Sequence, residues 1–251
     1  MEKEKILEVI NVNKLYRNKP VLHDINLFLV KGEILGLVGE SGCGKTTLSR
    51  CITGLITDYT GEITFNGHPI KQKNLKQIRQ NTAHIQMVFQ DPYSSLNPKK
   101  TIGWILEEGL RVRKQGTSDD RKKRVIEILE LVALPIDVIS RYPHELSGGQ
   151  RQRVSIGCAL MLNPEIIIAD EPVSSLDVSI QAQILNLLIK INKELGISII
   201  FISHDLNVVY YLCDRIAVMN GGKIIECNIA DKIYNNPQHH YTKSLLDSIL
   251  I

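Results

Sequence analysis

Short apolar runs alternate with segments of helical spacing along most of this chain. Residues 34–38, 166–169 and 197–202 are almost continuously apolar, which is typical of strands that are covered on both faces. Between residues 179 and 195 the apolar positions instead recur at the spacing of one helix face. This alternation predicts an α/β fold with a mainly parallel sheet.

The N-terminal and central parts of the chain follow two other patterns. Apolar and polar residues alternate loosely near residues 6–12, 25–30 and 61–66, and glycines separate these runs. Such runs predict an N-terminal antiparallel β subdomain. From about residue 98 to residue 162 the pattern is mostly helical, so we expect a helical subdomain that is inserted into the α/β core.

A single domain is expected, because the chain has no internal repeat, low-complexity tract or long Gly/Ser linker. This domain would span residues 1–251, a length sufficient to bury a substantial core. The catalytic α/β core, with the β subdomain, would comprise about residues 1–90 and 164–251. The helical subdomain would comprise about residues 91–163.

The composition is that of an ordinary globular protein, with 43% hydrophobic and 23% charged residues. The formal net charge of +3 is too small to indicate a nucleic-acid partner. Residues 111–124 are locally basic, but acids surround them, so we interpret this stretch as a solvated helical face. The five cysteines lie far apart and include no Cys-x-x-Cys pair, which argues against a disulfide framework or a structural zinc site.

No apolar stretch approaches the ~20 residues that cross a bilayer, and no apolar signal-peptide segment follows the charged residues 2–5. We therefore expect a chain that folds in the cytoplasm and reaches a membrane only through partner proteins.

A phosphate-binding loop is the clearest chemical motif. Residues 39–46 read Gly-Glu-Ser-Gly-Cys-Gly-Lys-Thr and fit G-x-x-x-x-G-K-[ST] between a predicted strand and a predicted helix. This context favours a P-loop NTPase (RecA-like) core over an incidental glycine-rich turn. Lys45 would reach the β- and γ-phosphates, and the Thr46 hydroxyl would bind Mg²⁺. The expected nucleotide-binding residues of the loop are Gly39, Glu40, Ser41, Gly42, Cys43, Gly44, Lys45, Thr46 and Thr47.

Two acids and a histidine follow predicted strands. Asp170 and Glu171 end one strand, and we expect Asp170 to serve Mg²⁺ while Glu171 is the general base that activates water. The alternative for such a pair is a helix N-cap. His204 follows another strand and would contact the γ-phosphate or orient Glu171, the alternative being a structural histidine.

A five-residue motif indicates the protein family. Leu146-Ser147-Gly148-Gly149-Gln150 precedes a helix that is predicted to begin near Arg151, and a serine beside two glycines at a helix start forms an anion-binding nest. All five positions match the signature motif of ATP-binding-cassette (ABC) transporters. The chain resembles the nucleotide-binding subunits of that family from about residue 6 to residue 250.

Other positions extend the resemblance. Tyr16 stands where the family stacks an aromatic ring on adenine, and Gln90 resembles the Q-loop glutamine that senses Mg²⁺ and water. Asp177 ends a D-loop in which Ser175 replaces the more usual alanine, and His204 matches the H-loop. The resemblance thus implies Mg²⁺ ligands at Thr46, Gln90 and Asp170, and catalytic roles for Glu171, His204 and Lys45.

The resemblance also implies partners. Two ATPase subunits, identical or paralogous, would form a head-to-tail dimer, with ATP between the phosphate loop of one and the signature motif of the other. Ser147 and Gly149 would then bind the partner's nucleotide. The dimer would sit at the cytoplasmic face of the cell membrane on two transmembrane permease subunits, and an extracytoplasmic binding protein would supply the substrate.

Within the family, the chain resembles the importers of peptides and nickel. Residues 90–98 and 171–179 are typical of that group, and residues 236–242 resemble its His-Pro-Tyr-Thr tail, with His240 in place of the proline. The adjacent His239 and His240 raise a metal site as an alternative, which is disfavoured because sequence neighbours rarely ligate one metal together. Dipeptides, oligopeptides, nickel and metal chelates all remain open as substrates.

Two rival functions remain within the family, a soluble ABC ATPase outside transport and a subunit that binds ATP without hydrolysing it. The presence of Lys45, Asp170, Glu171 and His204 argues against the second. A third alternative, a P-loop kinase or GTPase, is disfavoured because it would not explain the presence of the Leu146–Gln150 motif.

Overall fold

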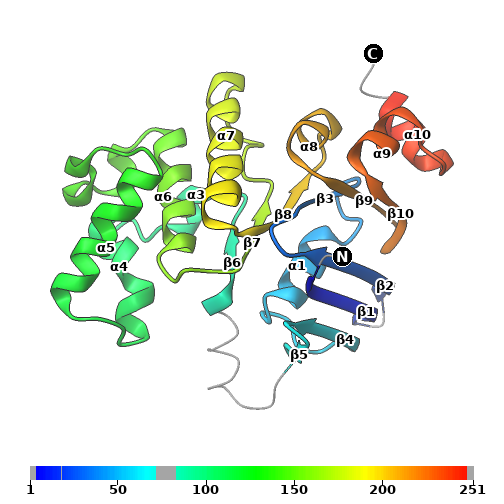
Figure 1. Ribbon diagram of the computed structural model, residues 1–251, viewed down its shortest axis with the longest axis horizontal. Helices are drawn as coiled ribbons and strands as arrows, with labels where there is room; N and C mark the ends of the chain where they lie inside the picture. Colours follow the sequence, from blue (N-terminus) through cyan, green and yellow to red (C-terminus); the bar gives the residue numbers. More distant parts are fainter. Residues whose placement is uncertain (1–3, 18, 72–82, 248–251) are drawn as a thin grey trace.

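Two β-sheets with a helix between them form the core of the protein (Figure 1). The computed structural model describes residues 4–17, 19–71 and 83–247. We expected no signal peptide at the start of the chain, and the first three residues of that segment lie outside the described ranges. The antiparallel sheet has the order β2-β1-β4-β5, and the mainly parallel sheet has the order β10-β9-β3-β8-β7-β6. The strands are β1 (Lys5–Tyr16), β2 (Lys19–Val30), β3 (Ile34–Val38), β4 (Thr60–Phe65), β5 (His68–Pro69), β6 (Ile85–Val88), β7 (Ile166–Asp170), β8 (Ser198–Ser203), β9 (Arg215–Asn220) and β10 (Lys223–Ile229).

Alternate residues of the parallel strands face two different hydrophobic cores. On β7, Ile166 and Ile168 pack with the antiparallel sheet and with α1 (Lys45–Ile52). Ile167 and Ala169 pack on the opposite side, against the remaining helices. All four side chains are fully buried because both faces of the strand are covered. The predicted parallel sheet and the antiparallel β subdomain are confirmed.

A group of helices connects two strands, β6 and β7, that are neighbours in the parallel sheet. β6 and β7 pair in parallel, and the helices that connect them form the green group at the left of Figure 1. This confirms the helical stretch that the sequence predicts, whereas the boundaries near residues 91 and 163 stay a prediction. The connecting elements are α3 (Pro92–Ser95), α4 (Ile102–Val112), α5 (Ser118–Leu131), the short 3₁₀ helices η1 (Ile136–Ser140) and η2 (Pro143–Glu145), and α6 (Gly148–Leu160).

The helices after β7 cover the sheet face opposite α1 and lead to the C-terminus. α7 (Val178–Leu195) matches the predicted helix to within a residue. It is followed by α8 (Leu206–Leu212), α9 (Ala230–Asn235) and α10 (His240–Asp247). Of the helices in the described ranges, none combines the length and apolarity that spanning a membrane would require.

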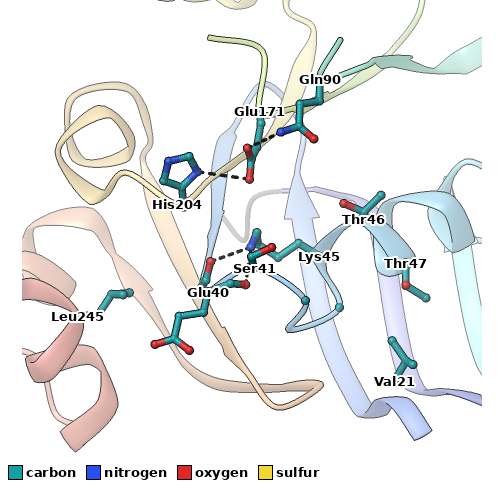
Figure 2. Close-up of a pocket in the computed structure, with 13 residues that line it drawn as sticks. Val21, Glu40, Ser41, Lys45, Thr46, Thr47, Gln90, Glu171, His204 and Leu245 are labelled. Carbon is teal, nitrogen blue, oxygen red and sulfur yellow. Dashed lines mark hydrogen bonds and ion pairs between the residues drawn. The ribbon is translucent and has the colours of Figure 1, made fainter. Parts of the chain in front are cut away.

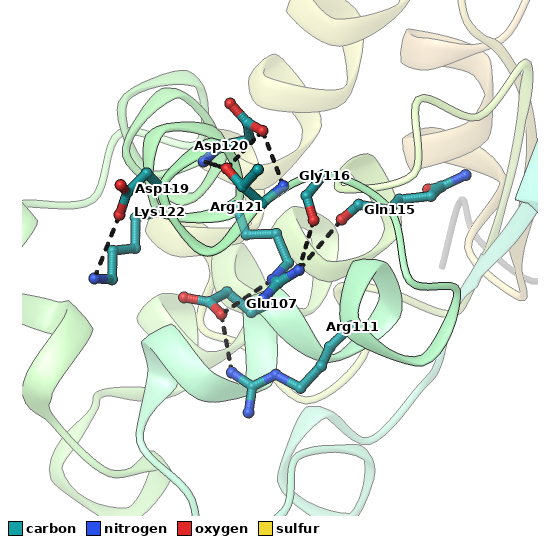
Figure 3. A network of polar contacts seen from close by, with 9 residues as sticks. Glu107, Arg111, Gln115, Gly116, Asp119, Asp120, Arg121 and Lys122 are labelled. Atoms are coloured by element: carbon teal, nitrogen blue, oxygen red, sulfur yellow. Dashed lines mark hydrogen bonds and ion pairs between the residues drawn. The ribbon is translucent and has the colours of Figure 1, made fainter.

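Most residues of the basic stretch at 111–124 are exposed, as a solvated face predicts, but internal contacts hold part of it (Figure 3). The Arg111 guanidinium donates to the Glu107 carboxylate at 2.9 Å, and Arg121 lies 3.7 Å from the same carboxylate. Arg121 also donates to the carbonyl oxygen of Gly116 at 2.8 Å. Its side chain is only 19% exposed, so the interpretation as a solvated face is wrong for Arg121, which instead ties the loop between α4 and α5 to α4.

Candidate active site

A pocket of about 590 Å³ opens where the loop between β3 and α1 turns (Figure 2). Its volume is in the range of small-ligand sites. The backbone N–H groups of the first turn of α1 have no partner within the helix, so this end of α1 favours an anion. The pocket is lined by Val21, Gly39, Glu40, Ser41, Gly42, Gly44, Lys45, Thr46, Thr47, Gln90, Glu171, His204 and Leu245.

Two glycines of the loop are required by its close packing. Gly39 has φ 154°, and a Cβ there would lie 2.1 Å from the carbonyl oxygen of Met219. Gly44 caps the start of α1 with φ 113°, and a Cβ there would lie 2.7 Å from Cε of Met219. Only glycine fits at either position, and the loop is therefore held tightly against β9.

The Lys45 side chain folds back over this loop. Its Nζ donates to the carbonyl oxygens of Gly39 at 2.7 Å and Glu40 at 2.9 Å, and the residue is only 6% exposed. A phosphate that enters the loop would compete with these two carbonyl dipoles for a full positive charge, and an anion is the stronger partner.

Strand register brings the remaining polar residues to the same edge of the sheet. Val38 pairs with Ser203 in the β3–β8 ladder, and Asp170 pairs with Ile202 in the β7–β8 ladder. The phosphate loop, Glu171 and His204 therefore begin at one level, just past the carboxyl ends of adjacent parallel strands. This is where open α/β sheets bind ligands.

The Glu171 carboxylate lies between two side chains (Figure 2). Gln90 donates from Nε2 to Oε2 at 2.9 Å, and Nδ1 of His204 lies 3.4 Å from Oε1. Glu171 has φ 46°, a left-handed conformation that non-glycine residues rarely adopt. The next helix, α7, begins only at Val178 and is capped by Asp177, so the interpretation of Asp170-Glu171 as a helix N-cap is wrong.

Asp170 is more deeply buried than the neighbouring Glu171. It is 5% exposed, and burial raises the pKa of its carboxyl, while the neighbouring Thr46 hydroxyl acts in the opposite direction. Thr46, Gln90 and Asp170 offer hydroxyl, amide and carboxylate oxygens. That donor set suits Mg²⁺, which takes few protein ligands beside phosphate oxygens and water.

The signature motif lies outside this pocket, since none of residues 146–150 lines it. Ser147 caps α6, because its Oγ accepts the Gln150 N–H at 3.3 Å and the Gln150 side chain accepts the Ser147 N–H at 3.0 Å. The helix therefore begins at Gly148, earlier than the predicted start near Arg151. Gly149 packs so closely that a Cβ would lie 2.6 Å from Cγ2 of Ile180.

Besides the buried Asp170, three further expected residues are not among those that line the pocket. Tyr16 is 44% exposed, with Nζ of Lys14 lying 4.5 Å from its ring centroid. Cys43, within the phosphate loop, is buried at 8% exposure. Asp177 caps α7 through a 3.0 Å bond to the Ile180 N–H. Adenine stacking by Tyr16 and the D-loop role of Asp177 stay predictions.

Val21 and Leu245 also line the pocket, although they were not expected there. Val21 lies on β2 and Leu245 on α10. Neither carries a motif or a polar group, so no local signal in the sequence distinguishes them from ordinary packing residues.

The sequence is similar to a known protein family and to known transport proteins. Residues 22–174 match the family model described as ABC transporter. The chain is 48% identical to the oligopeptide transport ATP-binding protein OppF of Bacillus subtilis (strain 168), over 98% of this chain and 83% of that relative. It is 42% identical to the dipeptide transport ATP-binding protein DppF of Haemophilus influenzae, over 98% of this chain and 79% of that protein.

Solved structures share the fold. CbiO1 of Clostridium perfringens, described as part of the ABC transporter complex cbiONQ, has a TM-score of 0.85 and 31% identity over 93% of this chain and 92% of its own. The ATP-binding cassette MJ0796, in a dimeric post-hydrolysis state bound to ADP and Pi, has a TM-score of 0.81 and 30% identity over 89% of this chain and 98% of its own. These similarities confirm the predicted fold class.

Replacement of Asp170 tests how burial affects this site. The carboxyl holds its proton more tightly in the folded chain, so its contribution to stability falls as the pH rises from its ordinary pKa of 3.8 through the raised folded value. We expect Asp170→Asn to increase the free energy of unfolding at pH 7, and we expect this gain to vanish below about pH 4.

Urea denaturation over a pH series, without nucleotide or divalent cation, measures this effect. Asp247→Asn, which alters an exposed carboxylate at the end of α10, is the matched control. A variant that is less stable than the wild type at pH 7 would contradict the assignment of burial as the dominant cause.

Proposed function

Because the chain belongs to the ABC transporter family, we propose that it is the ATP-hydrolysing subunit of an importer that takes up peptides. The observation that carries the proposal is the Glu171 carboxylate, held between Gln90 and His204 at the same pocket as the Lys45 loop. One pocket thus supplies a cation for the phosphates and a carboxylate for the water.

ATP binds through the phosphate loop. The N–H groups at the start of α1 and the Lys45 ammonium face the β- and γ-phosphates. Thr46, Gln90 and Asp170 would hold Mg²⁺, which when bound would supply positive charge beside the phosphate oxygens. Tyr16 stacks on the adenine from the end of β1.

Hydrolysis depends on the orientation of Glu171. As general base, its carboxylate accepts the proton of the water that attacks the γ-phosphate. The contacts with Gln90 and His204, at 2.9 and 3.4 Å, hold both carboxylate oxygens and so restrict the side chain to one orientation. Asp170 is buried, whereas the Glu171 carboxylate contacts Gln90 and His204, so the two neighbouring acids serve different partners.

A second subunit completes each site. The signature motif lies outside the pocket of its own chain, and in a head-to-tail dimer it faces the nucleotide of the partner. Ser147, Gly148 and Gly149 present the N-terminus of α6, which attracts the terminal phosphate. The nucleotide bridges the two surfaces, and hydrolysis removes that bridge, so the dimer closes and opens with each cycle.

The substrate and the site of action are inferred from the relatives. OppF and DppF are described as transport ATP-binding proteins for oligopeptides and dipeptides. These names favour peptides over nickel or metal chelates, and nothing in the comparisons favours a soluble non-transport ATPase. We place the chain at the cytoplasmic face of the membrane, where it binds two permeases. An extracytoplasmic binding protein delivers the substrate to these permeases.

Glu171→Gln tests the general base. It should lower ATP hydrolysis by at least about 100-fold while ATP still binds, so that size-exclusion chromatography with ATP shows more dimer than for the wild type. Glu194→Gln, an exposed change on α7, is the control. Hydrolysis by Glu171→Gln at the wild-type rate would show that another group is the base.

Gly148→Glu tests the composite site. A Cβ at this position approaches only Leu176 Cδ2, at 3.4 Å, so the chain should fold, while the new carboxylate repels the partner's triphosphate. We expect ATP-dependent dimerisation and hydrolysis to fall at least about tenfold, and ATP binding by each subunit to persist. Gln115→Glu, in the loop between α4 and α5, adds the same charge elsewhere; equal losses in both variants would refute the dimer arrangement.

The importer assignment is tested with the assembled complex. ATP hydrolysis by the subunit, reconstituted with its permeases and binding protein, should rise when oligopeptides are added. Stimulation by nickel chelates alone would overturn the peptide assignment, and failure to copurify with any integral membrane subunit would overturn transport.

A further inference from the structure

The C-terminal tail is fastened to β10 immediately before α10. The Glu226 carboxylate accepts the backbone N–H groups of Gln238 at 2.9 Å and His239 at 3.1 Å. The imidazole of His239 then accepts the Tyr241 N–H through Nδ1, also at 3.1 Å. These bonds satisfy N–H groups at the start of α10 that have no partner within the helix.

These contacts also account for the adjacent histidines. Their ring centroids lie 4.4 Å apart, and Nδ1 of His239 is already engaged as an acceptor. Within the described residues, no group of three or more His, Cys, Asp or Glu side chains is placed to hold a metal ion. His239 belongs to the attachment of α10.

The opposite sides of α10 have different surroundings. Thr242 and Leu246 are buried, at 0% and 8% exposure, and fix the helix to the body of the protein. Tyr241 and Leu245, spaced by one helical turn, lie toward the phosphate loop. Leu245 lines the pocket (Figure 2), and the Tyr241 hydroxyl oxygen accepts the backbone N–H of Glu40 at 3.3 Å.

Glu40 links this contact to the lysine. Its N–H is held by Tyr241 and its carbonyl oxygen accepts the Lys45 ammonium at 2.9 Å. A residue that is fixed at both its N–H and its C=O has little freedom to rotate, although it lies in a loop with several glycines. The tail therefore constrains the segment that holds the ammonium before phosphate binds.

We propose that Tyr241 is a positioning residue for the phosphate loop, held in place by Glu226 and His239. The proposal rests on the proposed function, because the loop matters only if it binds a nucleotide. Tyr241 is not among the residues that line the pocket and acts through the conformation of Glu40, so it affects how readily the loop accepts phosphates rather than the chemical step.

Tyr241→Phe removes the acceptor and retains the ring. Since one hydrogen bond contributes modestly, we expect the KM for ATP to rise about threefold to tenfold, with kcat changed by less than about twofold. Tyr234→Phe is the matched control, because the Tyr234 hydroxyl donates to Asn207 and stays clear of the loop. Glu226→Ala, which releases the start of α10, should raise the KM in the same way.

A second measurement does not depend on ATP. Hydrogen exchange of the Glu40 amide in the full chain should be about threefold to tenfold faster in Tyr241→Phe than in Tyr234→Phe. Unchanged exchange together with an unchanged KM would overturn the proposal. A fall in kcat and in melting temperature without a rise in KM would also overturn it, by showing a general structural role. A wild-type chain that fails to bind ATP would instead refute the proposed function, and the exchange result would still decide the role of Tyr241.

Discussion

A lysine ammonium enclosed by a glycine turn is the interaction on which the rest of this site depends. Lys45 is 6% exposed and is held by the carbonyl oxygens of Gly39 and Glu40. Neutral carbonyl dipoles offset only part of the cost of removing a full charge from water, so the ammonium keeps a strong preference for an anion. The turn requires glycine at position 39, because the Met219 carbonyl oxygen occupies the space in which a Cβ would lie.

The parallel sheet provides the second constraint. Strands in parallel register end at one edge, and here the ladder that pairs Asp170 with Ile202 brings Glu171 and His204 to the level of the phosphate loop. A charge that attracts phosphate and a carboxylate that can accept a proton are thereby placed in one pocket, although more than a hundred residues separate them in the chain.

The site nevertheless depends on parts of the protein that are remote from this edge. The signature motif caps α6 in the helical group and lies outside the pocket, which is why the proposed mechanism needs a second subunit. The tail reaches the pocket from the other direction, through Tyr241 and Leu245 on α10. The phosphate loop thus receives contacts from α10, and in the proposed dimer the nucleotide that it binds is also faced by the signature motif of a partner.

By itself the sequence determined the fold class, the strands β3, β7 and β8, the helix α7 and the loop that bears Lys45, because these are encoded by local periodicity and by residue types at fixed spacing. It also marked Glu171 and His204, since each follows a run of apolar residues. Only the tertiary structure decided that the Asp170-Glu171 pair caps no helix and that Arg121 is engaged within its own subdomain. It alone revealed the contact between Tyr241 and the phosphate loop. Such features depend on which distant segments meet, and a contact across about two hundred residues leaves no trace in the local pattern from which elements are read.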